Sequence, residues 1–215
     1  MTTNRRRFLE SAAANAAALA IMPAAAFAAI PRDVPDLHGS DEWDLTWTDK
    51  LKGKESAVFD CTEPESGSGV WRASIWKTQN ASVLKVATAT LVPVVVLRHT
   101  AIILAMQQSF WDKYDIGKKK KVTDPMTDEP TTKNPVLSEG EGSLHSLMEN
   151  GAVILACNMA FQQCIATIAS REKVSHDEAK KSALAALVPG VILQPSGVFA
   201  ALHAQNAGAS YLKAS

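Results

Sequence analysis

Short apolar runs alternate with helical patterns along most of the chain, and this alternation predicts the fold. Strand-sized apolar runs occupy 56–61, 91–97, 151–157 and 191–193. Helical spacing of apolar residues follows them at 70–84, 101–114, 143–150, 157–169, 177–187 and 198–208. A strand–helix alternation of this kind predicts one α/β domain over residues 55–215, a parallel sheet with helices on both of its faces.

Two segments interrupt this pattern. Residues 29–54 are polar and irregular, and we interpret them as an N-terminal arm in which Trp43 and Trp47, four residues apart, anchor the arm on the domain. Residues 115–142 contain few apolar residues, three prolines and a run of four lysines at 118–121. We expect a long surface excursion, with the lysines in a solvated loop.

The first 28 residues have the parts of an export signal. Three arginines at 5–7 precede an alanine-rich apolar run at 12–28, which ends in a small-x-small cleavage site, Ala26-Phe27-Ala28. The arginine segment resembles the twin-arginine signal of bacterial proteins. It predicts that the protein is exported to the periplasm and that the signal peptide is then removed. The alternative is an N-terminal helix that anchors the protein in the membrane.

Charge and hydropathy exclude two classes of partner. The chain has 22 basic and 22 acidic residues, so it lacks the basic excess of a nucleic-acid binder, and loss of the signal would remove three arginines. No apolar run after residue 28 is long enough to span a bilayer, so we expect no stable membrane span after processing.

Parallel strands place their carboxyl ends at one edge of a sheet, so the pattern also predicts a site. Cys157 lies where the third strand passes into a helix, close to the positive end of the helix dipole, and is the candidate catalytic thiol. Four further residues at strand ends or helix starts are candidate ligand-binding neighbours: Cys61, His99, Asn158 and Ser196.

Several uses of the cysteines remain open at this stage. Cys157 could be a buried structural residue, could form a disulfide with Cys61 if their strands were neighbours as in a flavodoxin-like order, or could bind a soft metal with Cys61 and His99. Cys164 follows Cys157 by seven helical residues, about 10 Å, which is too far for a bridge between them. The sequence contains neither Gly-x-Gly-x-x-Gly nor a phosphate-loop motif, and we predict no cofactor and no metal.

Three blocks of the sequence resemble the DsrE/DsrF-like family of small sulfur-relay proteins, specifically its exported members. They are Val96–His99 with Trp111 and Tyr114, Gly151–Ala160 around Cys157, and Leu187–Val198 with Ala204–Leu212. The resemblance implies a three-layer α/β/α sandwich with a mostly parallel, flavodoxin- or Rossmann-like sheet and assembly into homo-oligomers. It also implies that Cys157 carries sulfur as a persulfide between a donor and an acceptor, each a thiol protein or a small thiol.

The sequence thus predicts an exported protein that handles sulfur through Cys157, either as a sulfur carrier or as a sulfurtransferase. Two alternatives stay open: a non-enzymatic periplasmic protein that binds a small ligand or a metal at the same edge, and a structural subunit that docks on a larger complex through the Trp43/Trp47 arm.

Overall fold

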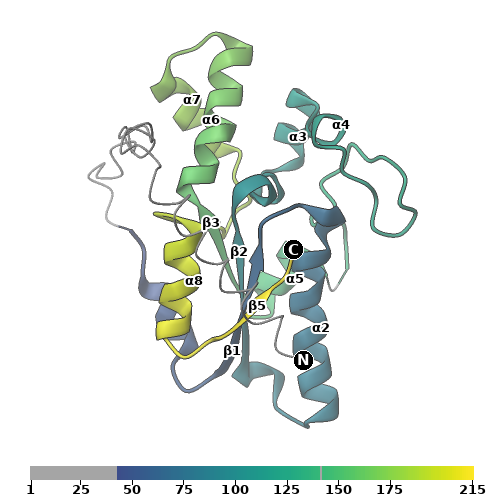
Figure 1. Cartoon of the computed structure of the whole chain (residues 1–215), viewed down its shortest axis with the longest axis vertical. Helices are drawn as coiled ribbons and strands as arrows, with labels where there is room; N and C mark the ends of the chain where they lie inside the picture. The colour runs from purple at the N-terminus through teal and green to yellow at the C-terminus, as the bar shows by residue number, and fades with distance from the viewer. Residues whose placement is uncertain (1–42, 141) are drawn as a thin grey trace, which may run out of the picture. The chain divides into compact units, whose positions relative to one another are not determined.

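Five parallel strands form a single sheet in the order β4-β3-β2-β1-β5 (Figure 1). The computed structural model describes residues 43–140 and 142–215, so the predicted signal peptide and most of the arm lie outside the described residues. The strands are β1 (Glu55–Cys61), β2 (Leu91–Leu97), β3 (Val153–Cys157), β4 (Ile192–Gln194) and β5 (Ser210–Lys213). The predicted α/β/α sandwich is confirmed.

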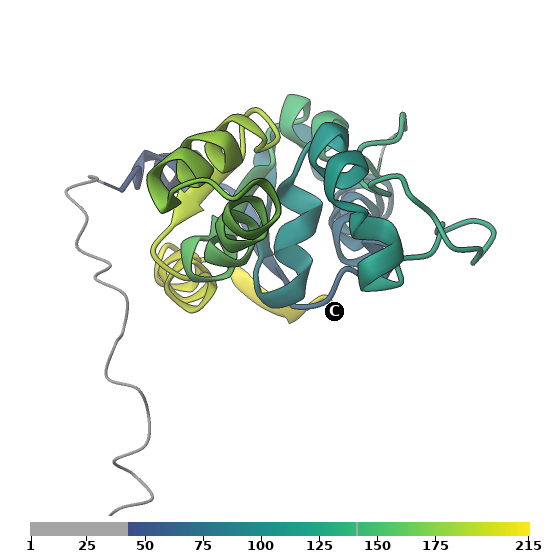
Figure 2. The same ribbon diagram turned by 90° about the horizontal axis from the view of Figure 1, so that it is seen from above.

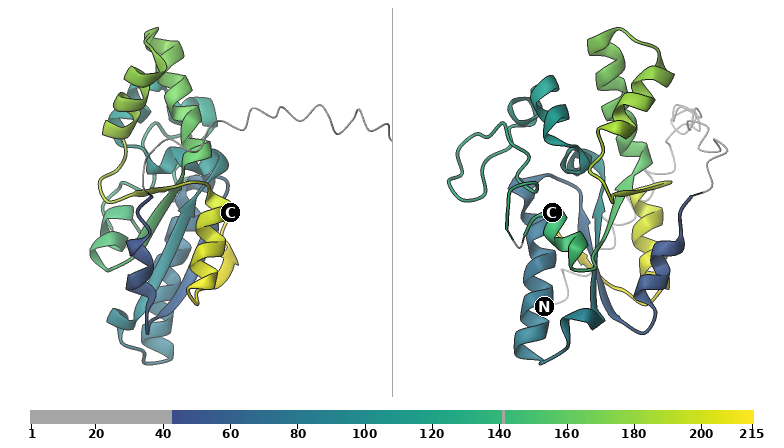
Figure 3. Two further views of the ribbon diagram at one scale, coloured as in Figure 1. Left: turned by 90° about the vertical axis from the view of Figure 1, so that its left-hand side faces the viewer. Right: turned by 180° about the vertical axis from the view of Figure 1, so that it is seen from behind.

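Connection handedness determines which face of the sheet each crossover helix covers. The first three crossovers each place the next strand on the same side of the previous one, whereas the last crossover returns to set β5 beside β1. A right-handed crossover that reverses direction must pass over the opposite face of the sheet. Helix α8 (Gly197–Asn206) belongs to the last crossover and therefore covers the other face (Figure 3). The other described crossover helices do not lie on that face.

Helices of the first three crossovers pack on one face, where Phe59, Val95, Leu97 and Ile154 point into the larger core. This layer contains α2 (Ser68–Val83), the 3₁₀ helix η5 (His99–Ala105), α3 (Gln108–Tyr114), α4 (Ile116–Lys120), α5 (Leu144–Glu149), α6 (Asn158–Glu172) and α7 (His176–Ala185). Seen from above in Figure 2, these helices lie across the sheet from α8.

The opposite face has a smaller core, built from valines of the central strands against three alanines of α8. A 3₁₀ helix of the arm, η2 (Thr46–Leu51), adds Trp47 and Leu51 to this core, and the Trp47 ring meets His203 of α8 edge-on at 5.6 Å. The predicted anchoring role holds for Trp47, which is buried; Trp43 is half-buried and lies before the helix.

The structure corrects four expectations. The strand order is not flavodoxin-like, because β2 separates β1 from β3. Strand β5 is absent from the sequence prediction. The single helix expected over 101–114 is two helices, because Gln107 donates its main-chain N–H and side-chain amide to carbonyls at the end of α7. Lys118–Lys120 are exposed but helical, in α4, rather than in a loop.

Two short 3₁₀ turns complete the connections, η3 (Glu65–Gly67) before α2 and η4 (Thr88–Thr90) before β2. Residues 121–140 of the predicted excursion remain irregular, and Asn134 anchors them by donating to the carbonyls of Leu104 and Met106. In the part of the chain that is described, every helix is too short or too polar to cross a bilayer.

Candidate functional site

The sheet register brings the predicted strand-end residues to one level of the carboxyl edge. Leu97 pairs with Cys61 on one side and with Ala156 on the other, and Cys157 pairs with Gln194. Arg98, one residue beyond Leu97, therefore lies beside Cys157, about one strand spacing of 4.8 Å away. The strand-end residues therefore converge at this edge, as the parallel sheet predicts.

Cys157 lies at the topological switch point of the sheet. The connection after β3 leaves toward α6 on one face, whereas the connection after β4 leaves toward α8 on the other. In open α/β sheets such a divergence at the carboxyl ends opens the crevice in which ligands bind. The Cys157–Gln194 register pair marks this position.

The Cys157 thiol caps helix α6. Its Sγ accepts the N–H of Ala160 at 3.4 Å, and 6% of the residue is exposed. The sulfur thus lies at the N-terminal end of a 15-residue helix, the end at which the main-chain N–H groups are not paired within the helix. The local sequence explains this geometry, because β3 is apolar at every position and Asn158 starts the helix.

The other two cysteines are protonated core residues. Burial raises the pKa of Cys61 and of Cys164 to about 12, and the Asp60 carboxylate adds to the shift at Cys61. Gly69 of α2 approaches Cys61 so closely that a Cβ on the glycine would lie 2.5 Å from the sulfur. At neutral pH neither thiol supplies a thiolate, so both are structural.

Cys61 does not lie beside Cys157, so the prediction that Cys61 is a neighbour of this thiol is wrong. Their strands flank β2, and two strand spacings amount to about 9.6 Å, beyond the Cα separation of about 7 Å that a disulfide tolerates. All three cysteines are free. No group of three or more metal-ligating side chains occurs among residues 43–140 and 142–215, so the considered Cys61–His99–Cys157 metal site has no geometric support there.

The remaining predicted residues lie at this edge with different exposures. His99 is exposed, has a left-handed backbone with φ of 49°, and begins η5. Asn158 is half-buried and accepts from Gln162 at 3.3 Å. Ser196 is the N-cap of α8 and accepts the N–H of Phe199 at 3.0 Å. Asn158 and Ser196 thus start the two helices that diverge from the switch point.

Sequence reasoning did not predict the contacts of a polar cluster at the same edge. Arg98 donates from Nε and Nη2 to the two carboxylate oxygens of Asp60 at 2.6 and 2.7 Å, and the Tyr211 hydroxyl donates to Asp60 Oδ2 at 2.6 Å. Although burial acts to raise it, these hydrogen bonds hold the pKa of Asp60 below its ordinary value. Tyr211 lies on β5, so only recognition of the fifth strand could have revealed this contact.

The contacts of Gln194 are likewise not apparent from the sequence. Its side chain is fully buried, and its Nε2 donates to the carbonyls of Asp44 and Leu193 at 2.8 and 2.9 Å. It therefore ties the arm to the end of β4, next to Cys157. Its Oε1 has no partner within the described part of the chain.

Comparisons of the chain with models of protein families, with curated proteins and with solved structures gave no match. The functional argument therefore depends on the geometry of the edge.

Proposed function

We propose that this protein is a sulfur carrier in which Cys157 holds sulfur as a persulfide. The observation that carries the proposal is the contrast among the three thiols. Cys157 caps a helix at the switch point and accepts a main-chain N–H, whereas burial keeps Cys61 and Cys164 protonated. The resemblance to the DsrE/DsrF-like family supports the proposal, because it implies a carrier cysteine at the same position.

The proposed reaction is a balanced transfer of one sulfur atom. The Cys157 thiolate attacks the outer sulfur of a donor persulfide, the donor S–S bond breaks, and the donor thiolate leaves with the electron pair. An acceptor thiolate then attacks the outer sulfur of the Cys157 persulfide and regenerates the Cys157 thiolate. No external oxidant or reductant is consumed, because each S–S bond that forms replaces one that breaks.

The low exposure of Cys157 restricts the donor. With 6% of the residue exposed, the sulfur is open to a narrow reagent but not to the flat surface of a folded protein. We therefore assign the first step to a small sulfane-sulfur donor, such as inorganic polysulfide or a low-molecular-weight persulfide.

Intact-mass spectrometry after exposure to inorganic polysulfide tests the proposal. We expect a gain of one sulfur atom, reversed by reductant and mapped to Cys157 after alkylation. The Cys157→Ser variant should lose this gain while it keeps the fold, because serine also caps helices well. The matched control, Cys164→Ala on the same helix, should retain it. An unmodified wild type, or a modified Cys157→Ser variant, would refute the proposal.

The exported location is part of the same proposal and depends on residues 1–28. The mass of the protein purified from the periplasm should correspond to cleavage near Ala28 and should require an intact Arg5-Arg6 pair. An unprocessed chain that stays with the membrane fraction would instead favour the N-terminal anchor.

A further inference from the structure

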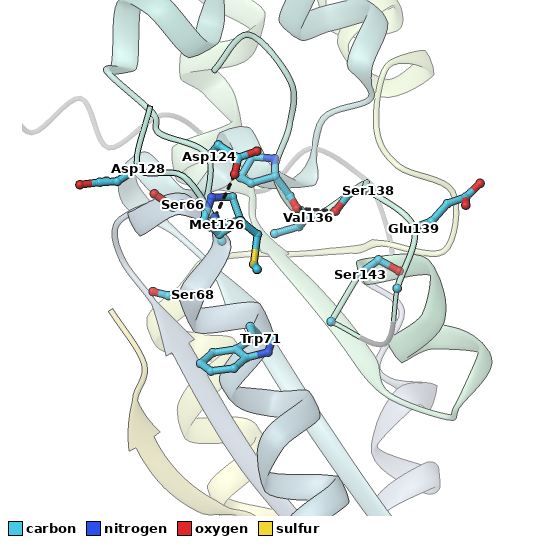
Figure 4. A pocket seen from close by; sticks show the side chains of 15 residues that line it. Ser66, Ser68, Trp71, Asp124, Met126, Asp128, Val136, Ser138, Glu139 and Ser143 are labelled. Atoms are coloured by element: carbon cyan, nitrogen blue, oxygen red, sulfur yellow. Dashed lines mark hydrogen bonds between the residues drawn. The ribbon is translucent and has the colours of Figure 1, made fainter. Parts of the chain in front are cut away.

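A cavity of about 590 Å³ lies between the start of α2 and the irregular segment formed by residues 122–140 and 142–143 (Figure 4). Its volume falls in the range of small-molecule sites, about 300–1,000 Å³. Its lining includes none of Cys61, His99, Cys157, Asn158 or Ser196. The cavity is therefore a separate site from the edge that carries Cys157.

The walls of this cavity are held in place by contacts between α2 and the loop. Ser66 and Thr123 share a hydrogen bond of 2.6 Å between their hydroxyls. Gly67, with φ of 82°, lets Val136 approach so closely that a Cβ on the glycine would lie 2.7 Å from a valine methyl. A cavity with walls fixed in this way exists before a ligand arrives, which lowers the entropy cost of binding.

An indole and a thioether supply the apolar part of the lining. Trp71 is 57% exposed on the outer face of α2, and Met126 is 89% exposed on the loop across from it. Figure 4 shows the Trp71 ring on one wall and the Met126 sulfur directed toward it from the other. Indole rings bind cations on their faces, and both groups accommodate apolar ligands.

The charge of the lining has one sign. Among the described residues, the lining contains three acidic side chains, Asp124, Asp128 and Glu139, and no lysine, arginine or histidine. The chain as a whole has a formal net charge of zero, so this local excess is not a general property of the protein. The start of α2 opposes it with roughly half a positive charge, which three carboxylates outweigh.

We propose that this cavity binds a small organic cation, an ammonium group attached to an apolar body. The ammonium group lies over the Trp71 indole, and the apolar body contacts Met126 and Val136. Figure 4 shows the Asp128 and Glu139 carboxylates directed away from Trp71, so these two groups attract the cation through their charge and not by contact. This second site is independent of persulfide formation at Cys157, and its test needs no sulfur chemistry.

Calorimetric titration with choline and with its neutral isostere, 3,3-dimethylbutan-1-ol, tests the proposal. The two probes have the same shape and differ in charge. We expect one choline bound per chain and at least about tenfold weaker binding of the alcohol, because the cation–π contact and the carboxylates act on the cation alone.

Two sets of variants locate the binding. Trp71→Ala should weaken choline binding about tenfold, and Trp71→Phe by less, because phenyl is a weaker cation acceptor than indole. The triple variant D124N/D128N/E139Q should also weaken it about tenfold. The loop keeps its local hydrogen bond in this variant, because an asparagine side chain can still accept the Met126 main-chain N–H that Asp124 accepts at 2.9 Å. The control D49N/E55Q/D177N makes the same change in net charge at exposed positions elsewhere and should bind as the wild type does.

Three results would overturn the proposal: no binding of choline, equal affinity for the alcohol, or unchanged affinity in Trp71→Ala with its fold intact by circular dichroism. Loss of binding in the control variant to the same extent as in the D124N/D128N/E139Q variant would also overturn it, because the effect would then belong to the whole charge of the protein. Each readout is separate from the mass gain at Cys157, so the two proposals can fail independently.

Discussion

Arg98 and Asp60 form a bidentate ion pair that joins the ends of β1 and β2 at the edge where Cys157 lies. The Asp60 side chain is 2% exposed and that of Arg98 is 20% exposed. Taking two charges out of water is costly, and the pair is stable because Tyr211 satisfies a further lone pair of the carboxylate. The pair holds the stem of Arg98 against Gly197 at the start of α8.

Replacement of Asp60 by asparagine should destabilise the protein by about 2 kcal/mol at neutral pH, because the Arg98 guanidinium loses its counter-charge in a largely buried position. The lowered pKa of Asp60 in the folded state adds a pH signature. Its stabilisation is present above the carboxyl's unfolded pKa, about 3.9, and is lost as the pH falls through the lower folded value.

Urea denaturation of both proteins between neutral and acidic pH measures this contribution. The difference in stability between the wild type and Asp60→Asn should shrink as the solution becomes acidic. A difference that stays constant with pH would show that the ion pair does not contribute in this way.

Substitution of Gly197 by alanine provides a test with two opposed expectations. Helix propensity alone predicts that alanine stabilises α8 by up to about 1 kcal/mol. An alanine Cβ, however, would lie 2.5 Å from Cδ and 2.6 Å from Cβ of Arg98, so the Arg98 main chain or the helix must shift. We expect packing to dominate and the variant to lose about 1–3 kcal/mol. Thermal denaturation decides the sign.

The neighbouring exposed residue serves as the control for Gly197. Val198→Ala changes the same helical turn without contact to the ion pair and should change stability by less than about 0.5 kcal/mol. A Gly197→Ala variant that is as stable as the wild type would show that the Arg98 side chain can move away from α8 without loss of stability.

Alkaline pH should weaken the fold through the two core thiols. Cys61 and Cys164 have folded pKa values of about 12 against an ordinary value of 9.0. A raised folded pKa means that the stabilisation is present below pH 9 and is lost as the pH rises toward 12. The loss should approach about 1.4 kcal/mol per pH unit for each thiol.

Guanidinium denaturation between pH 8 and 11 measures that slope, and the double variant C61A/C164A isolates it from the tyrosines. The variant should be less stable than the wild type at pH 8, because two packed side chains are truncated, yet should depend less steeply on pH. Identical slopes in the two proteins would contradict the assignment of these thiols as buried and protonated.

The resemblance to the DsrE/DsrF-like family implies a homo-oligomer, and the structure offers a surface for one. Leu202 is exposed on α8, and Tyr211 and Leu212 are exposed on the adjoining edge strand β5. Exposed edge strands with apolar neighbours pair readily with further chains. We expect light scattering to show a mass above one chain and Leu202→Lys to lower it.

The matched control for this surface is Leu184→Lys on α7, the same substitution at another exposed leucine. It should leave the assembly intact. A monomeric wild type would contradict the expectation, and so would a Leu202→Lys variant that assembles as the wild type does.

Local sequence predicted those parts of the fold in which local forces decide the structure. β2 was predicted residue for residue, because seven consecutive apolar and mostly β-branched residues are compatible with little besides a buried strand. β3 and the helix that follows Cys157 were predicted in place but with different bounds, 151–157 against Val153–Cys157 and 157–169 against Asn158–Glu172. The edge location of Cys157 follows from those two elements, so the central position of the site was predictable as well.

What the sequence did not reveal depends on partners far away along the chain. β5 has only four residues, all exposed, and is a strand because β1 offers it an open edge. The Asp60–Tyr211 contact could not be predicted either, because Tyr211 lies on β5. Likewise, no local signal distinguishes a strand order in which Cys61 and Cys157 are neighbours from the observed one, since both orders obey the handedness rule.

The place of β5 beside β1 also has a kinetic consequence. The hydroxyl of Tyr211 reaches Asp60 across 151 residues, and closing so long a loop carries a large entropic cost. Contacts of such high sequence separation slow folding, so the outer edge of β1 stays unpaired until the rest of the sheet has assembled. During that interval β1 can pair with β5 of another chain, so we expect exchange of the last strand between chains at high protein concentration.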